Sequence, residues 1–504
     1  MKFFKKGTSL GTDAVFLTVS RMMVAVIGVV TSMLLARFRT LEEYGTYSQI
    51  LMATELITTL FLLGLPNSIN YFLARAETEK EKQKFLSVYL TISTILTAII
   101  SLCLLFAMPL IIDYFNNPLI TGFAYVFAIY PWSMLMINSL SNVCVIYGRA
   151  NKLVFFNVIH ALITLLLLLL AKIFELDFQA YMIMYMASTL AFGVVSVLWI
   201  RLMSKRIVPK IDLSLIKQIF VFSVPMGLAS VVGTLNGELD KLVIGRFFST
   251  EEYAIFANAA KTLPVTMLSE SLTAVLLPCV VRLLKKQKNE RTIQVWSYAI
   301  KISFCLMCLI AGGLFVFAPD VMSLFYSEKY VTDAGVAVFR VYSSILLFRF
   351  TYWGMILNAT GKTKFVFYSS LLSMVLNFVG NIVSYYILGF IGPAISTFVV
   401  TFIIAFAQLW FSKNILQTKF SKIFPWKSMA KFLLQTICLG GFFWFLKYVV
   451  LQSYQGTVSI VISICMGIVW ALLYGAINFK TVIKNWKLLN SQRSEGEDFG
   501  ENEK

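Results

Sequence analysis

The chain has 504 residues, of which 59% are hydrophobic and only 13% are charged, and its mean hydropathy is +0.79. Soluble globular chains contain about 45–50% apolar and about 25% charged residues, so this composition excludes an ordinary soluble domain and indicates a chain surrounded mostly by lipid. The net charge of +18 does not indicate a nucleic acid partner, because most basic residues lie in short segments between apolar runs.

A single histidine, together with seven cysteines that all lie inside apolar runs, argues against a metal site or a redox centre. We therefore expect no bound metal, no cofactor and no catalytic residues.

Apolar segments recur along the whole chain at the length that a membrane span needs, about 20 residues for a hydrocarbon core of about 30 Å. They lie near residues 14–36, 47–72, 85–112, 119–147, 153–171, 179–200, 218–245, 254–281, 295–318, 335–358, 365–388, 393–412, 431–451 and 456–479. The sequence thus predicts an all-α polytopic membrane protein with about 14 transmembrane helices.

The basic residues predict the orientation of these spans. If the N-terminus is cytoplasmic, the outer loops contain few basic residues, and the inner segments contain most of the others. The basic residues of the outer loops are Arg37, Arg39, Lys172, Arg246, Lys329 and Lys447. A bias of this kind follows the positive-inside rule and predicts a multi-pass protein of the cytoplasmic membrane with both termini in the cytoplasm.

An internal repeat predicts the organisation of the chain. The segment ARFRTLEEYGTYSQI (36–50) aligns with GRFFSTEEYAIFANA (245–259), and IYGRANKLVFF (146–156) aligns with ATGKTKFVFYS (359–369). Six spans separate the copies, so both halves face the same way and predict two parallel six-helix lobes with a substrate path between them. The predicted boundaries are 1–202 for the N-lobe (spans 1–6), 203–415 for the C-lobe (spans 7–12), 416–480 for spans 13–14 and 481–504 for a polar cytoplasmic tail.

The same segments resemble a known family. ARFRTLEEYGTYSQI resembles the first-loop signature of the polysaccharide and oligosaccharide lipid flippases (the Wzx-type flippases for O-antigen, capsule and exopolysaccharide) of the multidrug/oligosaccharidyl-lipid/polysaccharide (MOP) superfamily. GLPNSINYFLAR (64–75), VPMGLASVVGTLNGELDKLVIGRFFSTEEYAIF (224–256) and LNATGKTKFVF (357–367) are similar to further parts of that family. The resemblance extends over roughly residues 10 to 415.

The resemblance implies a function that composition does not show. It implies a bacterial or archaeal transporter that flips undecaprenyl-pyrophosphate-linked oligosaccharide repeat units across the cytoplasmic membrane for cell-surface polysaccharide biosynthesis, by alternating access between two lobes. Its partners would be the lipid-linked oligosaccharide and the membrane lipids, with polysaccharide polymerase and chain-length proteins as candidate protein partners. The chain would not be an enzyme.

Three cations within spans are candidate ligands of the substrate pyrophosphate. Ionisable residues inside a span are costly and usually face a cavity or a partner. Arg21 lies about 10 Å into the first span at 1.5 Å per residue, Lys261 is comparably deep in the eighth, and Arg349 lies in the tenth. Arginine suits a pyrophosphate because its planar guanidinium donates two parallel hydrogen bonds. The resemblance places Arg21 and Lys261 on cavity-lining spans, and Arg349 is a third candidate.

Three carboxylates within spans are candidates for coupling or charge balance. Glu55 could neutralise Arg21 or bind a coupling H⁺ or Na⁺. Asp240 could instead be a structural residue at the end of the seventh span, and Glu270 is left without a preferred role. Glu238 and Lys241 are three residues apart, the spacing at which helical side chains meet, so they could form an internal pair or part of a site.

Several alternatives remain open from the sequence. A lipid II flippase also has fourteen spans, and a cation-coupled multidrug exporter of the same superfamily resembles a twelve-span chain. A membrane glycosyltransferase or polymerase would need catalytic residues in sizeable outer loops. The acidic pair Glu42–Glu43 could supply such residues, but Glu251–Glu252 repeats it in the second half, which favours a shared architectural role.

Overall fold

The computed structural model describes residues 10–205, 207–261, 266–451 and 456–501. Throughout these residues the regular elements are helices, which confirms the predicted all-α fold class. Within these described ranges, ten helical stretches are long and apolar enough to cross a membrane. Packing divides the chain into two compact units, Met1–Ala254 and Ile255–Lys504, each of which is described by itself.

The first unit is built from long helices that follow the predicted spans. Its α-helices are α1 (Leu10–Phe38), α2 (Leu41–Leu62), α3 (Asn67–Arg75), α4 (Glu79–Phe115), α5 (Ala124–Phe127), α6 (Tyr130–Ile146), α7 (Ala150–Ile173), α8 (Phe178–Ser204), α9 (Leu213–Phe247) and the beginning of α10 (Thr250–Ala259), with the 3₁₀ helix η1 (Pro118–Phe123) before α5. Helix α1 packs against α7, and α6 packs against α8. Helix α9, which covers the predicted seventh span, packs against α2, α3 and α4 in this unit.

Polar side chains fix the helix ends of the first unit. Asp212 caps α9 by accepting a 3.0 Å hydrogen bond from the Leu215 N–H, and its Oδ2 lies 2.7 Å from the Lys84 Nζ on α4. The hydrogen bond from Lys84, and then the one from Leu215, hold the pKa of Asp212 below its ordinary value. The carboxylate is therefore charged at neutral pH, as a cap at a helix N-terminus requires.

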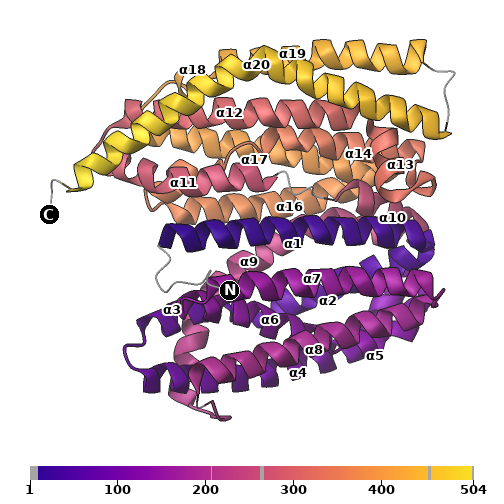
Figure 1. The fold of residues 1–504 in the computed structure, drawn as a ribbon, viewed down its shortest axis with the longest axis vertical. Helices are drawn as coiled ribbons and strands as arrows, with labels where there is room; N and C mark the ends of the chain where they lie inside the picture. Colours follow the sequence, from indigo (N-terminus) through magenta and orange to yellow (C-terminus); the bar gives the residue numbers. More distant parts are fainter. Residues whose placement is uncertain (1–9, 206, 262–265, 452–455, 502–504) are drawn as a thin grey trace, which may run out of the picture. The chain divides into compact units, whose positions relative to one another are not determined.

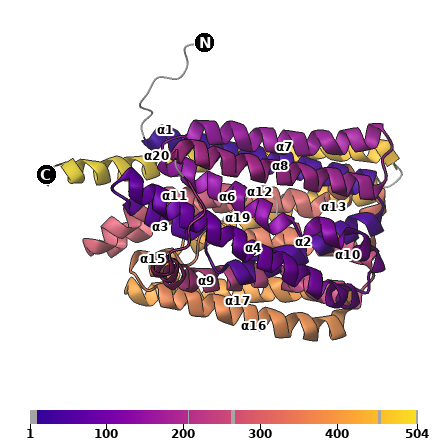
Figure 2. The ribbon, with the colours of Figure 1, turned by 90° about the horizontal axis from the view of Figure 1, so that it is seen from below.

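The second unit contains several short helices beside its long ones. Its α-helices after α10 are α11 (Thr266–Lys285), α12 (Asn289–Val316), α13 (Ala318–Tyr326), α14 (Asp333–Ile345), α15 (Met355–Ala359), α16 (Thr363–Leu388), α17 (Gly392–Ile415), α18 (Phe420–Ile423), α19 (Trp426–Phe445) and α20 (Gly456–Glu501). The 3₁₀ helices are η2 (Glu328–Tyr330), η3 (Leu346–Phe348) and η4 (Gly389–Ile391), and a π-helical turn, η5 (Leu446–Val450), follows α19. Helices α12, α19 and α20 pack side by side (Figure 1), and α16 packs along α17 (Figure 2).

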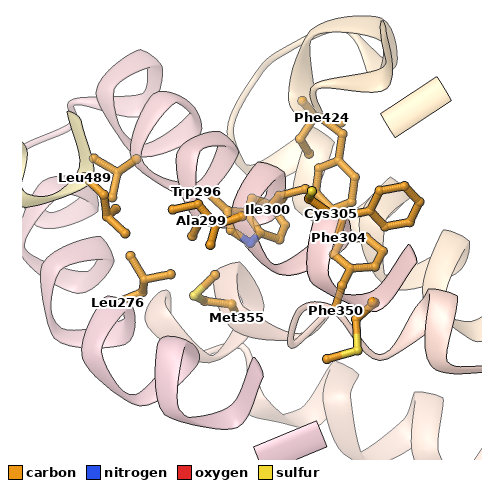
Figure 3. Packing of buried hydrophobic residues seen from close by; sticks show 14 of the residues in the cluster. Leu276, Trp296, Ala299, Ile300, Phe304, Cys305, Phe350, Met355, Phe424 and Leu489 are labelled. Carbon is orange, nitrogen blue, oxygen red and sulfur yellow. The ribbon is translucent and has the colours of Figure 1, made fainter. Parts of the chain in front are cut away.

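Aromatic packing around Trp296 forms the core of the second unit. Trp296 is fully buried on α12, and its ring lies edge-on to that of Phe424, with centroids 4.8 Å apart. Phe304, about two turns further along α12, meets Phe350 at 4.9 Å, and Figure 3 shows these rings with Met355 and Leu276 around them. The indole N–H of Trp296 donates to the Thr351 hydroxyl at 3.1 Å, so its polar atom is satisfied inside the core.

Not every predicted span is one continuous helix. The predicted segment 335–358 is divided into α14, η3 and α15, with a non-helical stretch between Phe348 and Met355. The predicted segment 254–281 comprises α10 and α11, between which residues 262–265 lie outside the described residues. Fourteen spans therefore stays a prediction, while the multi-pass helical character of the chain is established.

Candidate functional site

The second glutamate of each repeated acidic pair belongs to a helix cap. Thr40 Oγ1 accepts a hydrogen bond from the Glu43 N–H at 3.1 Å, and the Glu43 carboxylate accepts one from the Thr40 N–H at 3.0 Å. Ser249 and Glu252 form the same reciprocal pair in the second copy, at 3.2 and 3.0 Å. Each is a capping box, in which a Ser or Thr at the N-cap and a Glu three residues later satisfy two backbone donors. Both copies of the repeat therefore start a helix in the same way, and the carboxylates of Glu43 and Glu252 accept hydrogen bonds from the backbone.

The two copies of the repeat also meet each other inside the first unit. A Cβ atom on Gly45, in α2, would lie 2.7 Å from the Thr250 Cγ2 and closer still to the Thr250 carbonyl oxygen. Only a glycine fits this approach, and the second copy has Ala254 at the equivalent position. The start of α2 and the start of α10 are thus packed backbone to backbone.

Two of the three predicted cations share a pocket in the second unit. Lys261 and Arg349 both line a small cavity together with residues of α12, α14 and η3, among them Tyr342 and Ser343. The free volume of the cavity is about 20 Å³, which is room for about one water molecule. A pyrophosphate does not fit in this arrangement, so binding one would require the pocket to open.

Lys261 and Arg349 lie at interruptions of the helices. Lys261 follows the end of α10, where its N–H donates to the Asn258 carbonyl at 3.3 Å. Arg349 follows η3, where its N–H donates to the Leu346 carbonyl at 3.0 Å, with φ −95° and ψ 19°. A cation after a helix end is stabilised by the exposed carbonyls of the last turn. This structural role accounts for the placement of both residues and does not conflict with ligand binding.

Tyr342 is a member of this pocket that sequence reasoning missed. Within the described part of the chain its hydroxyl is buried and has no hydrogen-bond partner. Buried hydroxyls are usually hydrogen-bonded, so an unsatisfied one beside two cations indicates a place for a water molecule or a ligand oxygen. No motif marks Tyr342; only its position two turns before Arg349 could have drawn attention to it.

The predicted carboxylates belong to the first unit, apart from Glu270. Glu55 is exposed on α2 and lies within electrostatic reach of Glu238 and Lys241 on α9. Glu238 and Lys241 form an ion pair, as their spacing predicted. Asp240 is buried, and its Oδ1 accepts a 2.8 Å hydrogen bond from the Lys241 N–H. Among the side chains that the structure describes, Glu55 therefore has a pair of opposite charges as its electrostatic neighbours.

Two predicted site residues have side chains that the structure does not describe. Arg21 lies on α1 and Glu270 on α11, and the surroundings of both side chains lie outside the described residues. Their roles stay predictions. Among the residues that were described, no group of three or more His, Cys, Asp and Glu side chains could hold a metal ion.

Lys447 differs from the sequence prediction. The sequence placed it in an outer loop, but it is buried in the π-helical turn η5 and forms an ion pair with Asp320 at the start of α13. Its Nζ also donates to the Ser463 hydroxyl on α20 at 2.5 Å. These contacts connect α13, η5 and α20. Lys447 therefore has a structural role, although the sequence analysis counted it among the basic residues that predict the orientation of the spans.

Comparison with known proteins identifies the family. The family model described as "Polysaccharide biosynthesis protein" matches residues 34–335, which is more than half of the chain. The capsular polysaccharide biosynthesis protein CapF of Staphylococcus aureus is 24% identical over 161 residues. That alignment covers 31% of this chain and 40% of CapF, so the chain matches less than half of the length of this curated relative.

Solved structures show the same fold. The lipid II flippase MurJ, in an inward closed conformation, matches with a TM-score of 0.73 at 16% identity, over 93% of this chain and 100% of MurJ. An inward-facing multidrug resistance MATE family transporter of the MOP superfamily matches with a TM-score of 0.63 at 16% identity, over 80% of this chain and 98% of the transporter. The chain therefore shares the fold of these two solved structures. Because the family model matches more than half of the chain, the chain belongs to the polysaccharide biosynthesis protein family.

Proposed function

We propose that this transporter flips undecaprenyl-pyrophosphate-linked oligosaccharide repeat units across the cytoplasmic membrane for the biosynthesis of a cell-surface polysaccharide. The observation that carries the proposal is the pocket in which Lys261, Arg349 and the unsatisfied hydroxyl of Tyr342 come together, in a chain of this family. Two cations and a hydroxyl donor suit the oxygens of a pyrophosphate. Arg21, in the first unit, stays a candidate pyrophosphate ligand from the sequence.

The physical need for such a site comes from the glycan. A polar group transferred to hydrocarbon without a hydrogen-bond partner costs roughly 2–7 kcal/mol, and an oligosaccharide carries many hydroxyls. The protein must therefore enclose a wet, polar path while the polyprenyl chain stays in lipid. Alternating access provides such a path, and the tight packing of Gly45 on Thr250 supports an outer closure made by the two copies of the repeat.

The source of energy is proposed to be an ion gradient, the membrane potential or consumption of the flipped lipid. Glu55, with Glu238 and Lys241 beside it, is the proposed H⁺ or Na⁺ coupling group, and Asp240 and Glu270 are further candidates. The sequence contains no Gly-rich P-loop that would bind nucleotide. We propose both termini in the cytoplasm, and polysaccharide polymerase and chain-length proteins as partners.

A second candidate function is supported by the fold. The match to the lipid II flippase MurJ extends over 93% of this chain, and a lipid II flippase would handle the same class of pyrophosphate-linked lipid. The MATE likeness supports a cation-coupled exporter less, because it covers a smaller share of the chain with a lower TM-score. The family model favours the polysaccharide precursor among the three.

The test is transport by the purified protein in sealed vesicles that contain a fluorescent lipid-linked oligosaccharide. We expect Lys261→Gln and Arg349→Gln each to reduce the initial rate about tenfold, which corresponds to about 1.4 kcal/mol of lost headgroup binding, and Tyr342→Phe to reduce it less. Lys301→Gln is the matched control, because Lys301 lies on α12 over the ring of Tyr298 and is absent from the residues that line the pocket.

Other outcomes decide between the candidates. Transport of lipid II in preference to the oligosaccharide lipid would favour the second function. An absolute requirement for ATP would contradict the proposed energy source. Full activity of both Lys261→Gln and Arg349→Gln would remove the pocket from the mechanism.

A further inference from the structure

An apolar groove lies in the second unit between α12, α14 with η3, and α19. Its volume is about 430 Å³, within the range of about 300–1,000 Å³ that is usual for small-molecule sites. Only two lining residues carry a hydroxyl, Ser344 and Thr436, and each donates it to a carbonyl of its own helix, at 2.9 Å to Arg340 and at 2.9 Å to Phe432. The groove therefore offers an apolar surface along its length.

Glycines create the groove and keep it open. Gly440 and Gly441 on α19 line it, and a Cβ atom on Gly441 would meet no atom within 4 Å. Ile437 and Trp444, on the same helix, are 61% and 46% exposed, so the groove opens onto the surface of the chain. In a protein that crosses a membrane, such an apolar surface faces lipid chains.

One end of the groove is cationic. Arg340 is one turn before Ser344 on α14, its Nε donates to the Phe315 carbonyl at 3.2 Å, and its guanidinium lies 5.6 Å from the centroid of the Phe315 ring. Phe315 itself lines the groove. Within the described residues Arg340 makes no ion pair at 4 Å or less, so its charge is not neutralised by a carboxylate.

Two aromatic residues of α19 and η5 complete this end. Tyr448 follows Trp444 by one turn, with ring centroids 5.4 Å apart, and its hydroxyl donates to the Val316 carbonyl at 3.1 Å. The Tyr448 hydroxyl also lies within electrostatic and hydrogen-bonding reach of Arg340. The nearby Asp320 is already paired with Lys447, so this neighbouring pair is neutral overall and Arg340 supplies the net charge.

We propose that this groove binds an anionic phospholipid, with one acyl chain along the groove and the phosphate on the guanidinium of Arg340, which Tyr448 helps to position. An arginine within a span that faces an apolar surface needs a partner, and a phosphodiester supplies the negative charge and the acceptor oxygens. Trp444 and Tyr448 lie where amphipathic rings are favoured, between the headgroup and the chains. A zwitterionic lipid would bring its own cation to the same place, which is why the net charge of Arg340 selects an anionic headgroup.

The proposal does not depend on which lipid is transported, and it is tested on the full-length protein. The protein is purified in detergent and incubated with equimolar phosphatidylglycerol and phosphatidylcholine of the same chain length, and bound lipid is counted by native mass spectrometry. We expect one retained phosphatidylglycerol, with a preference over phosphatidylcholine that falls about tenfold in Arg340→Gln and less in Tyr448→Phe.

Two further variants test the binding of the acyl chain and of the headgroup separately. Gly441→Leu fills the groove where there is open space and should reduce retention of both lipids. Lys413→Gln is the matched control, because Lys413 also lies over an aromatic ring, 3.8 Å from the Trp410 centroid, and should keep the preference.

An unchanged preference in Arg340→Gln would overturn the headgroup assignment, and unchanged retention in Gly441→Leu would overturn the chain assignment. Displacement of phosphatidylglycerol from the wild-type protein by a stoichiometric amount of undecaprenyl pyrophosphate would show that the groove takes the polyprenyl lipid, and would overturn the proposal as well. If Arg340→Gln does not fold, Arg340→Lys replaces it, since it keeps the charge and should keep the preference.

Discussion

The Lys447–Asp320 pair is a buried ion pair of the second unit. Both side chains are nearly inaccessible, at 9% and 10% exposure, and Ser463 provides a third polar contact. Such a pair gains little over apolar residues of the same size, but removal of one partner leaves a buried charge without compensation. Its role is therefore to specify how η5 meets α13 and α20, more than to add net stability.

We expect Lys447→Met to destabilise the protein by about 3–5 kcal/mol, because Asp320 is left buried and unpaired. The double variant Lys447→Met/Asp320→Leu should recover most of the loss, because it removes both charges. Thermal unfolding in detergent measures the difference. A double variant that is no more stable than Lys447→Met would contradict the explanation, since the loss would then come from the shape of the methionine or from Ser463.

At the residue scale the sequence predicted some of the site and missed some of it. It selected Lys261 and Arg349 because charges are rare inside apolar segments, and the structure places both in one pocket. It could not select Tyr342, because a tyrosine among many aromatic residues has no distinguishing pattern. It counted Lys447 with the outer loops, although the predicted apolar segment 431–451 contains it, and the structure places it in the turn η5.

At the scale of elements, the break between α2 and α3 shows what a motif of the family does physically. Leu63 and Gly64 both have positive φ, 42° and 73°, and turn the chain after α2. The turn packs directly on α9, where a Cβ atom on Gly227 would overlap the backbone of Leu63. The sequence analysis singled out the segment GLPNSINYFLAR only by its resemblance to the family. The structure explains why glycine is needed there: Gly64 adopts the left-handed conformation, and Gly227 on α9 lets the two backbones touch.

A pair of glycines on α9 provides the test of this contact. Gly227→Ala should lower the unfolding temperature, because the new Cβ atom would force Leu63 away. Gly233→Ala, on the same helix, meets nothing within 4 Å and should leave the stability unchanged or raise it by roughly 0.5–1 kcal/mol, as expected for alanine in place of glycine within a helix. Equal effects of the two substitutions on the unfolding temperature would show that helix propensity, and not contact with Leu63, governs both sites.

The element boundaries were predictable where local chemistry marks them. Thr40–Glu43 and Ser249–Glu252 follow the Ser/Thr-x-x-Glu pattern, and both helices start there. The break at Arg349 was not predictable, because residues 345–353 are apolar and aromatic apart from Arg349 and Thr351 and contain no proline or glycine. Tertiary packing of Phe350 on Phe304, and of Trp296 on Thr351, holds that stretch out of a helix.

At the scale of the whole molecule, the sequence predicted the class of protein with little ambiguity, because about 20 consecutive apolar residues have few uses outside a membrane. The division of the chain into two packing units was harder to predict from the sequence. The repeat places equivalent segments about 209 residues apart, but it does not say which helices pack together, and α9 packs with α2 and α4 inside the unit that ends at Ala254. The lobe boundary at residue 202 therefore rests on the sequence repeat alone and stays a prediction.

The interrupted segment α14–η3–α15 is the span on which the predicted topology most depends. If it crosses the membrane despite its break, Glu328 before it and Lys362 after it lie on opposite sides, with Lys362 in the cytoplasm as the positive-inside rule requires. Both side chains are exposed, so single cysteines at these positions, in a chain without its seven native cysteines, can be labelled by a maleimide that does not cross membranes. In intact cells we expect Glu328→Cys to be labelled and Lys362→Cys to be labelled only after permeabilisation, with Glu42→Cys and Lys285→Cys as the outer and inner controls.

Labelling of Glu328→Cys and Lys362→Cys from the same side would show that the segment enters the membrane and returns. The orientation of every later helix would then be reversed, and the C-terminus could no longer be cytoplasmic.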